Sequence, residues 1–232
     1  MNPDAMTYLQ GRGMSIESIQ EFKLGYAPHM SGDRVSSFDS IPNSLALHLN
    51  RKDQLNHAIL FPVCDVSGRM RYFQSRPFNS MGGLKYIGAS DNHPLYCEDD
   101  RLYGFHIAKR KLRSTNGRII GVEGAPDTII CNQHGIPAVG FLGTVVNEKT
   151  FELLDKYRVT ELILLLDGDK AGRDRTKKIA EKYIAINTQV RLKVAHIPEG
   201  DPDEYINKYG ASALWNIIND APLAIQYLVD VK

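Results

Sequence analysis

Two aspartates stand where an apolar run ends. Asp167 and Asp169 follow the stretch ELILLL and are separated only by Gly168, which keeps the turn tight. In an extended segment, residues at alternate positions point the same way, so both carboxylates are expected on one face. Carboxylates this close repel each other unless a cation lies between them. The pattern predicts a metal site at the end of a buried strand, and a solvated turn or a helix cap is the alternative.

Further acids follow two other apolar runs. Glu123 ends the strand predicted within GRIIGVEG, and Asp201 and Asp203 stand in PEGDPDEY after the run QVRLKVAHI. In open parallel sheets, functional groups gather at the carboxyl ends of the strands, so these acids are expected to meet at one edge. Carboxylate oxygens suit hard cations, which predicts Mg²⁺ or Mn²⁺.

The second half of the chain alternates short apolar strands with helices. The sequence predicts strands within 117–124, 136–144, 161–169 and 189–198, and helices over 125–135, 147–158 and 170–186. Such strands, apolar on both faces, favour a mostly parallel sheet flanked by helices. Residues 202–231 are expected to form short helices.

The first half of the chain has a different sequence pattern, which is rich in predicted β-strands. It predicts two short helices within 4–24 with Ser15 as an N-cap, a helix near 42–50, a hairpin over 57–78, an extended piece at 84–90 and a helix over 100–112. The fold class is therefore α+β or α/β: a mixed β-rich N-terminal subdomain, then a parallel-sheet domain, then short helices. The expected divisions are 1–116, 117–200 and 201–232.

Composition limits the function classes. Of 232 residues, 43% are hydrophobic and 24% charged with a net charge of +1, so any nucleic-acid contact must come from local patches. The three cysteines, Cys64, Cys97 and Cys131, form no CxxC pair, which argues against a zinc site or a disulfide framework and favours a reducing compartment. No apolar run approaches the roughly 18 residues of a membrane span. A cytoplasmic protein is expected.

Basic and aromatic residues alternate along the predicted hairpin. We expect Arg69 and Arg71 to face one groove and to bind backbone phosphates. Three aromatic residues are expected to stack on unpaired bases: Tyr72, Phe73 and Tyr86. The alternative is a solvated strand face over core aromatics. Lys170 and Arg173, just past the paired aspartates, are candidates for nucleotide contacts. A salt bridge on the surface of a helix is the alternative for Arg173.

Four stretches together resemble a known family. VEGAPDTI, FLGT, LLLDGDKAGRD and PEGDPDEYI are similar to the Toprim domain of bacterial and phage DnaG-type primases. Upstream, TYLQGRGMSIESIQEFKLGYAP, ILFPVCDVSGRMRYFQSRPF, LKYIGAS and LYGFHIAK resemble the preceding parts of the primase catalytic core, in the family's order. The resemblance covers nearly the whole chain.

The resemblance implies a nucleotidyltransferase that makes short RNA primers on single-stranded DNA with two metal ions. It implies a metal-binding set of Glu123, Asp127, Asp167, Asp169, Asp201 and Asp203, with Glu123, Asp167 and Asp169 also catalytic. Glu123 is expected to act as a general acid/base or to organise the site, with ligation as its alternative. Arg76 and Lys85 match basic positions that the family uses near phosphates. The implied partners are single-stranded DNA, ribonucleoside triphosphates and a replicative helicase.

The chain departs from the family at several points. His57 and Ala58 stand where arginine is frequent, Gly88-Ala89-Ser90 replaces an Asn-Ser-Pro, and Pro126 replaces a hydrophobic residue. Neither a zinc-binding module nor a helicase-binding domain is found in the sequence. We therefore expect an excised core or a piece of a longer primase or primase–helicase, with weak recognition of start sites and with its helicase contact in a region absent here.

Two other functions are compatible with Toprim chemistry. One is a metal-dependent nuclease or topoisomerase, although no P-loop of an ATPase is present and the upstream sequence resembles primase. The other is a non-catalytic module that binds single-stranded DNA. The complete acidic set favours the primase.

Overall fold

The structure, a computed structural model, describes residues 2–27, 57–78, 86, 102–143 and 146–231. The chain divides into two compact units, unit 1 (Met1–Asp100) and unit 2 (Arg101–Lys232). None of the helices in the described segments is long and apolar enough to cross a membrane.

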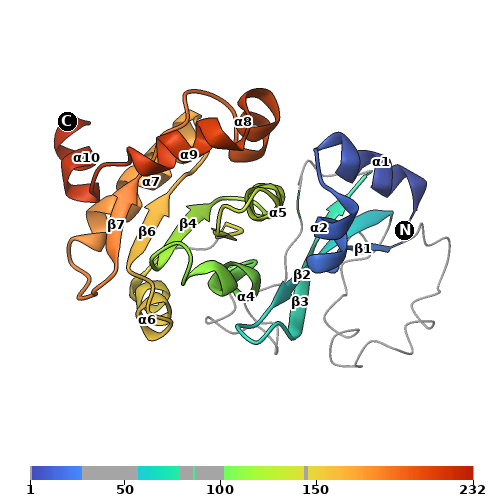
Figure 1. Cartoon of the computed structure of the whole chain (residues 1–232), viewed down its shortest axis with the longest axis horizontal. Coiled ribbons are helices and arrows are strands. Elements are labelled where there is room, and N and C mark those ends of the chain that lie inside the picture. The colour runs from blue at the N-terminus through green and yellow to red at the C-terminus, as the bar shows by residue number, and fades with distance from the viewer. Residues whose placement is uncertain (1, 28–56, 79–85, 87–101, 144–145, 232) are drawn as a thin grey trace. The chain divides into compact units, whose positions relative to one another are not determined.

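Unit 1 combines two short helices with an antiparallel sheet (Figure 1). Helices α1 (Pro3–Gly11) and α2 (Ile16–Glu21) precede a sheet of order β1-β2-β3. Its strands are β1 (Gly25–Ala27), β2 (Ala58–Cys64) and β3 (Met70–Pro77). The Ser15 hydroxyl accepts a hydrogen bond from the Ser18 N–H at 3.1 Å, which confirms the predicted N-cap of α2.

Asp65 shapes the turn of the predicted hairpin. Its carboxylate accepts hydrogen bonds from the Ser67 N–H at 2.8 Å, from the Ser67 hydroxyl at 2.6 Å and from the Arg69 side chain at 3.1 Å. Burial alone would raise the pKa of Asp65, but these bonds outweigh it and hold the pKa below its usual range. The turn therefore positions β3 against β2 in register, with Phe61 opposite Gln74.

Unit 2 is built on a parallel sheet of strand order β5-β4-β6-β7. The strands are β4 (Arg118–Val122), β5 (Ala138–Gly140), β6 (Glu161–Leu164) and β7 (Arg191–Val194). The helical segments are α4 (Phe105–Ala108), η3 (Lys109–Lys111), α5 (Ala125–Gln133), α6 (Glu148–Lys156), α7 (Lys170–Tyr183), α8 (Pro202–Tyr209), α9 (Ala211–Asn219) and α10 (Ala224–Asp230). The predicted parallel sheet with flanking helices is confirmed.

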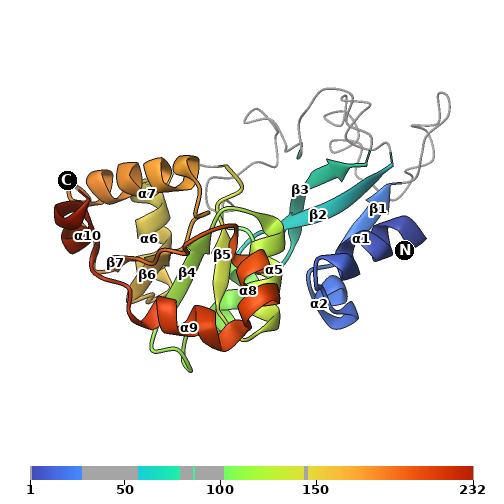
Figure 2. The ribbon, with the colours of Figure 1, turned by 90° about the horizontal axis from the view of Figure 1, so that it is seen from above.

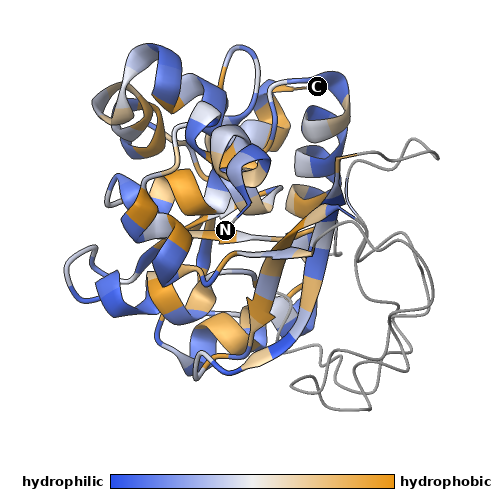
Figure 3. Ribbon diagram, turned by 90° about the vertical axis from the view of Figure 1, so that its right-hand side faces the viewer, coloured by the Kyte–Doolittle hydropathy of each residue, from blue (hydrophilic) through white to orange (hydrophobic). Residues whose placement is uncertain are grey.

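The helices of unit 2 lie on both faces of this sheet. Figure 2 shows α6 and α7 on one side, and α8 and α9 on the other. Helix α5 packs against α8, and α10 packs against α7 and β7. Figure 3 shows helices that carry both hydrophobic and hydrophilic residues, as expected of elements that bury one face. The strands between them are fully buried at Ile119, Ile120, Leu162 and Ile163.

Most of the predicted elements are present. The exception is the helix expected over 100–112, which is shorter: α4 begins after Gly104, whose φ of 78° is left-handed, and η3 follows. Tyr103 exchanges backbone hydrogen bonds with Gly140 at 2.9 and 3.0 Å, which ties this segment to β5. The predicted helix near 42–50 lies outside the described residues, and so does the extended piece at 84–90 except for Tyr86. The division at Gly117 stays a prediction.

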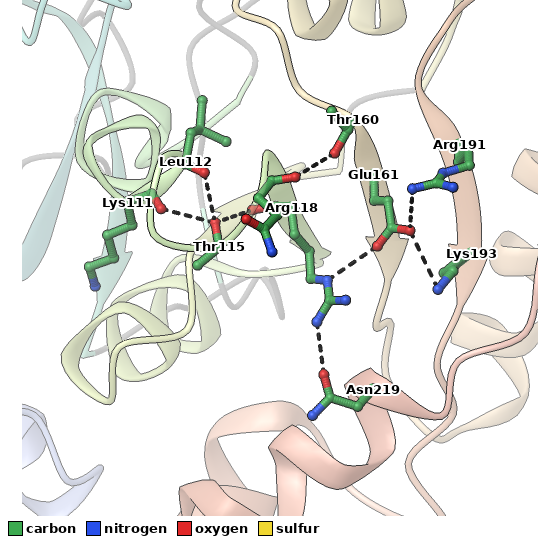
Figure 4. Close-up of polar contacts among 10 residues, drawn as sticks. Lys111, Leu112, Thr115, Arg118, Thr160, Glu161, Arg191, Lys193 and Asn219 are labelled. Atoms are coloured by element: carbon green, nitrogen blue, oxygen red, sulfur yellow. Dashed lines mark hydrogen bonds and ion pairs between the residues drawn. The ribbon is translucent and has the colours of Figure 1, made fainter.

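A buried glutamate ties together the amino-terminal end of the sheet (Figure 4). Glu161 is 8% exposed and contacts three cations from neighbouring strands. Its oxygens lie 3.2 Å from Arg118 Nε, 3.0 Å from Arg191 Nη2 and 3.5 Å from Lys193 Nζ. Arg118 also donates a hydrogen bond to the Asn219 side chain at 2.8 Å, which connects α9 to the same network. This network crosslinks β4, β6, β7 and α9 at the edge opposite to the acidic strand ends.

Glu161→Gln is expected to lower the free energy of unfolding by about 2–3 kcal/mol. The substitution leaves three positively charged side chains close together without the negative charge that now compensates them. Urea unfolding would measure the change. Glu152→Gln, an exposed position on α6, is the matched control and should stay within about 0.5 kcal/mol of wild type. Equal stability of the two variants would contradict a structural role for the network.

Candidate metal centre

The acids found in the sequence gather at the carboxyl edge of the unit 2 sheet. Glu123 directly follows β4, Asp167 and Asp169 follow β6, and Asp201 and Asp203 follow β7. These three strands are parallel and adjacent in the order β4-β6-β7, so their ends share one edge. The predicted placement of the acids is therefore present in the fold.

Three of the predicted metal ligands form a close group. Asp127, Asp201 and Asp203 each place a carboxylate oxygen within 4.8 Å of the others. Asp127 is 5% and Asp203 only 1% exposed, although acids are rarely this buried. We call Asp127, Asp201 and Asp203 the acidic cluster.

Helix ends hold the acidic cluster in place. Asp127 accepts hydrogen bonds from the Gly124 N–H at 3.2 Å and the Asp203 N–H at 3.3 Å, which joins the start of α5 to the start of α8. Asp201 caps α8 by accepting from the Glu204 N–H at 2.9 Å. The positive ends of two helix dipoles thus favour negative charge at this point.

A buried thiol lies beside the acidic cluster. Cys131, on α5, is fully buried, and burial together with the charges of Asp127, Asp203 and Asp201 raises its pKa well above the usual value. The thiol therefore stays neutral. Three carboxylates remain as hard oxygen donors, and such a donor set fits Mg²⁺ or Mn²⁺.

The paired aspartates lie in a neighbouring loop and are not members of the close group. The Gly168 N–H donates to the Gly200 carbonyl at 2.9 Å, which joins the loop after β6 to the loop after β7. A Cβ at Gly168 would lie 2.8 Å from the Ile197 carbonyl oxygen, so this close approach needs glycine. Asp169 caps α7 by accepting from the Gly172 N–H at 2.7 Å. The helix cap foreseen as an alternative is thus present at Asp169.

Two arginines of α7 reach the strand-end loops. Arg173 donates to the Gly168 carbonyl, between the paired aspartates. Arg175 donates to Oε2 of Glu123. Lys170, another predicted nucleotide contact, pairs with Asp174 at 2.9 Å on the exposed surface. Sequence reasoning did not assign Arg175 a role, because no local pattern connects it with Glu123.

In unit 1, an arginine is enclosed by two tyrosine rings. The Arg76 guanidinium lies 4.6 Å from the centre of the Tyr8 ring and 5.3 Å from that of Tyr86, and it donates to the Tyr86 hydroxyl at 3.3 Å. Burial raises the pKa of Tyr86, so its hydroxyl stays protonated. Tyr8, which the sequence reasoning did not single out, is far from Arg76 in sequence and meets it only in the fold.

The other predicted residues of unit 1 have mixed outcomes. Tyr72 and Phe73 are 8% and 7% exposed and belong to the core, as the alternative expected. Arg69 is exposed but pairs with Asp65 in the turn. Arg71 is half-buried on β3, and Lys85 lies outside the described residues. The phosphate-binding roles of these basic residues stay predictions.

Two family profiles match the chain. Residues 1–109 match the profile described as DNA primase catalytic core, N-terminal domain, and residues 120–206 match a Toprim-like profile. Curated relatives include the DNA primase of Geobacillus stearothermophilus, 32% identical over 219 residues, and that of Pseudomonas aeruginosa, 30% identical over 224 residues. These alignments cover 89% and 90% of this chain but 36% and 33% of the relatives. The chain thus spans about a third of their length.

Solved structures agree over nearly the whole chain. The Aquifex aeolicus primase, with its zinc-binding and RNA polymerase domains, has a TM-score of 0.82 at 28% identity, covering 99% of this chain and 58% of that one. A DnaG catalytic core has a TM-score of 0.82 at 26% identity, covering 99% and 76%. A DnaG primase catalytic domain bound to single-stranded DNA has a TM-score of 0.81 at 26% identity, covering 99% and 75%. Sequence profiles, curated relatives and fold agree, and the chain belongs to the DnaG-type primases as a catalytic core of that family.

Proposed function

We propose that this chain synthesises short RNA primers on single-stranded DNA, as a DNA-directed RNA polymerase. The observation that carries the proposal is the acidic cluster at the carboxyl edge of the sheet, in a chain whose curated relatives are DNA primases. In this reaction a primer 3′-hydroxyl attacks the α-phosphate of a ribonucleoside triphosphate, and pyrophosphate leaves.

In the proposed site, Asp127, Asp201 and Asp203 hold Mg²⁺ or Mn²⁺, and Asp167 and Asp169 complete the set from the neighbouring loop. Divalent ions bound by these carboxylates would neutralise phosphate charge and lower the pKa of the attacking hydroxyl. Asp203 and Asp127 are buried, so their carboxylates are shielded from water and act strongly on nearby charges. Glu123 lies beside the cluster, where it acts on the reacting groups or organises the ligands.

The proposed substrates are negatively charged polymers and nucleotides. Arg76, framed by Tyr8 and Tyr86, presents a guanidinium with fixed orientation to phosphates. Arg71 and Lys85 are proposed as further phosphate contacts. Arg69, Lys170 and Arg173 are proposed as weaker contacts, since each already has a protein partner. A replicative helicase is the proposed partner through a region outside this chain, in the cytoplasm of a bacterial cell or a phage-infected host.

The decisive experiment is primer synthesis on mixed single-stranded DNA templates with labelled ribonucleotides and Mg²⁺ or Mn²⁺. Short, alkali-labile products are expected from wild type and none from Asp167→Ala. DNA nicking without synthesis would favour a Toprim-type nuclease. DNA binding with neither activity would favour a non-catalytic module.

A further inference from the structure

Arg175 connects α7 with the loop after β4. On α7 it neighbours the buried residues Gly172, Thr176 and Ile179. Its Nη1 donates to Oε2 of Glu123. Strands β4 and β6 are neighbours in the sheet, and this bond joins the segments that follow them. The position is half-exposed: the side chain of Arg175 is 44% exposed and that of Glu123 only 19%.

The two oxygens of Glu123 have different surroundings. Oε2 is occupied by Arg175, whereas Oε1 is buried and accepts no hydrogen bond from any described residue. A buried carboxylate oxygen without a donor is costly and calls for a functional reason. Glu123 is adjacent in the chain to Gly124, whose backbone N–H donates a hydrogen bond to Asp127. Glu123 therefore lies next to the acidic cluster.

We propose, resting on the primase function proposed above, that Arg175 is a positioning residue for Glu123. By holding Oε2 and balancing its charge, Arg175 keeps the carboxylate turned so that Oε1 faces the reacting groups and is not drawn in as a further metal ligand. Arg175 acts through Glu123 and does not itself contact substrate.

This role predicts effects of opposite sign on metal affinity and on turnover. Without the guanidinium, Glu123 contributes an uncompensated negative charge, and Mn²⁺ affinity rises about threefold at low salt. The freed carboxylate loses its orientation, and the turnover number falls about tenfold or more. The KM for nucleotide changes little, because Arg175 does not bind it. A general loosening of the fold would instead lower metal affinity and turnover together.

The test measures Mn²⁺ binding by calorimetry and primer synthesis for Arg175→Ala, Arg175→Lys, Glu123→Gln and the double variant Glu123→Gln/Arg175→Ala. Arg175→Lys keeps the charge and is expected to restore wild-type Mn²⁺ affinity and most of the turnover. In the Glu123→Gln background, removal of Arg175 should change neither quantity. Lys178→Ala removes one positive charge from an exposed position of the same helix and is the matched control.

Unchanged or weaker Mn²⁺ binding by Arg175→Ala would overturn the proposal, as would a rise in the KM for nucleotide with unchanged turnover. An additive effect in the double variant would also overturn it. If wild type synthesised no primers, the proposed function would fail, but the Mn²⁺ titrations would still decide whether Arg175 balances Glu123.

Discussion

Asp203→Asn is expected to lower primer synthesis about a thousandfold or more and, at the same time, to stabilise the metal-free protein. Asparagine keeps the shape of the side chain but removes the charge of the most buried member of the acidic cluster, which is 1% exposed. A bound ion would then have one negatively charged ligand fewer. The loss is large because the site is buried, where little water screens the interaction. In the absence of metal, the same change relieves repulsion among three carboxylates and raises the thermal midpoint by a few degrees.

Primer synthesis with Mg²⁺ and thermal unfolding in a chelator would measure the two effects. Asp220→Asn, an exposed aspartate at the end of α9, is the matched control and should change neither. A destabilised Asp203→Asn protein would show that the carboxylate serves the fold and not an ion. Near-normal synthesis would remove Asp203 from the metal site.

Gly172→Ala is expected to destabilise the protein by about 3 kcal/mol and to lower primer synthesis about a hundredfold. A Cβ at this position would lie 2.1 Å from the Asp167 carbonyl oxygen, which is a backbone atom and cannot rotate away. The first turn of α7 must then move, and it carries the Gly172 N–H that Asp169 caps. The loop with both paired aspartates is displaced as a result.

Urea unfolding and primer synthesis would test this prediction. Gly11→Ala is the matched control, because a Cβ there meets nothing within 4 Å at the end of α1. Alanine favours the helical backbone over glycine, so Gly11→Ala should be neutral or stabilising by up to about 1 kcal/mol. If the two variants had the same stability, the close approach of α7 to Asp167 would be unimportant.

Much of unit 2 follows from local sequence patterns. Strands β4 and β6 carry apolar runs, and Asn147 caps α6 as expected by accepting from the Thr150 N–H at 3.3 Å. Parallel strands place their carboxyl ends at one edge, which made it predictable that Glu123 and the later acids follow strands at the same edge of the sheet. The helices and strands can be predicted because they depend on hydrophobic periodicity and on hydrogen bonds between residues close in the chain. Both can be inferred from a single sequence.

The finer geometry depends on packing between distant elements. Asp127 joins Asp201 and Asp203 because α5 packs against α8, and no spacing in the sequence encodes that contact. The pairing of Arg175 with Glu123 and of Tyr8 with Arg76 likewise arises from side chains that meet across elements.

The helix caps also set the energetics of ion capture. Asp201 and Asp127 are fixed by backbone N–H groups of α8 and α5, so their rotamers are restrained whether or not an ion is present. Capture of an ion then orders little of the chain and loses little conformational entropy. Exchange of one divalent ion for another of similar radius should leave this preorganised frame unmoved. For the proposed site we therefore expect the choice between Mg²⁺ and Mn²⁺ to depend on the intrinsic chemistry of each ion and its supply in the cell, because the carboxylates are held in the same positions for both.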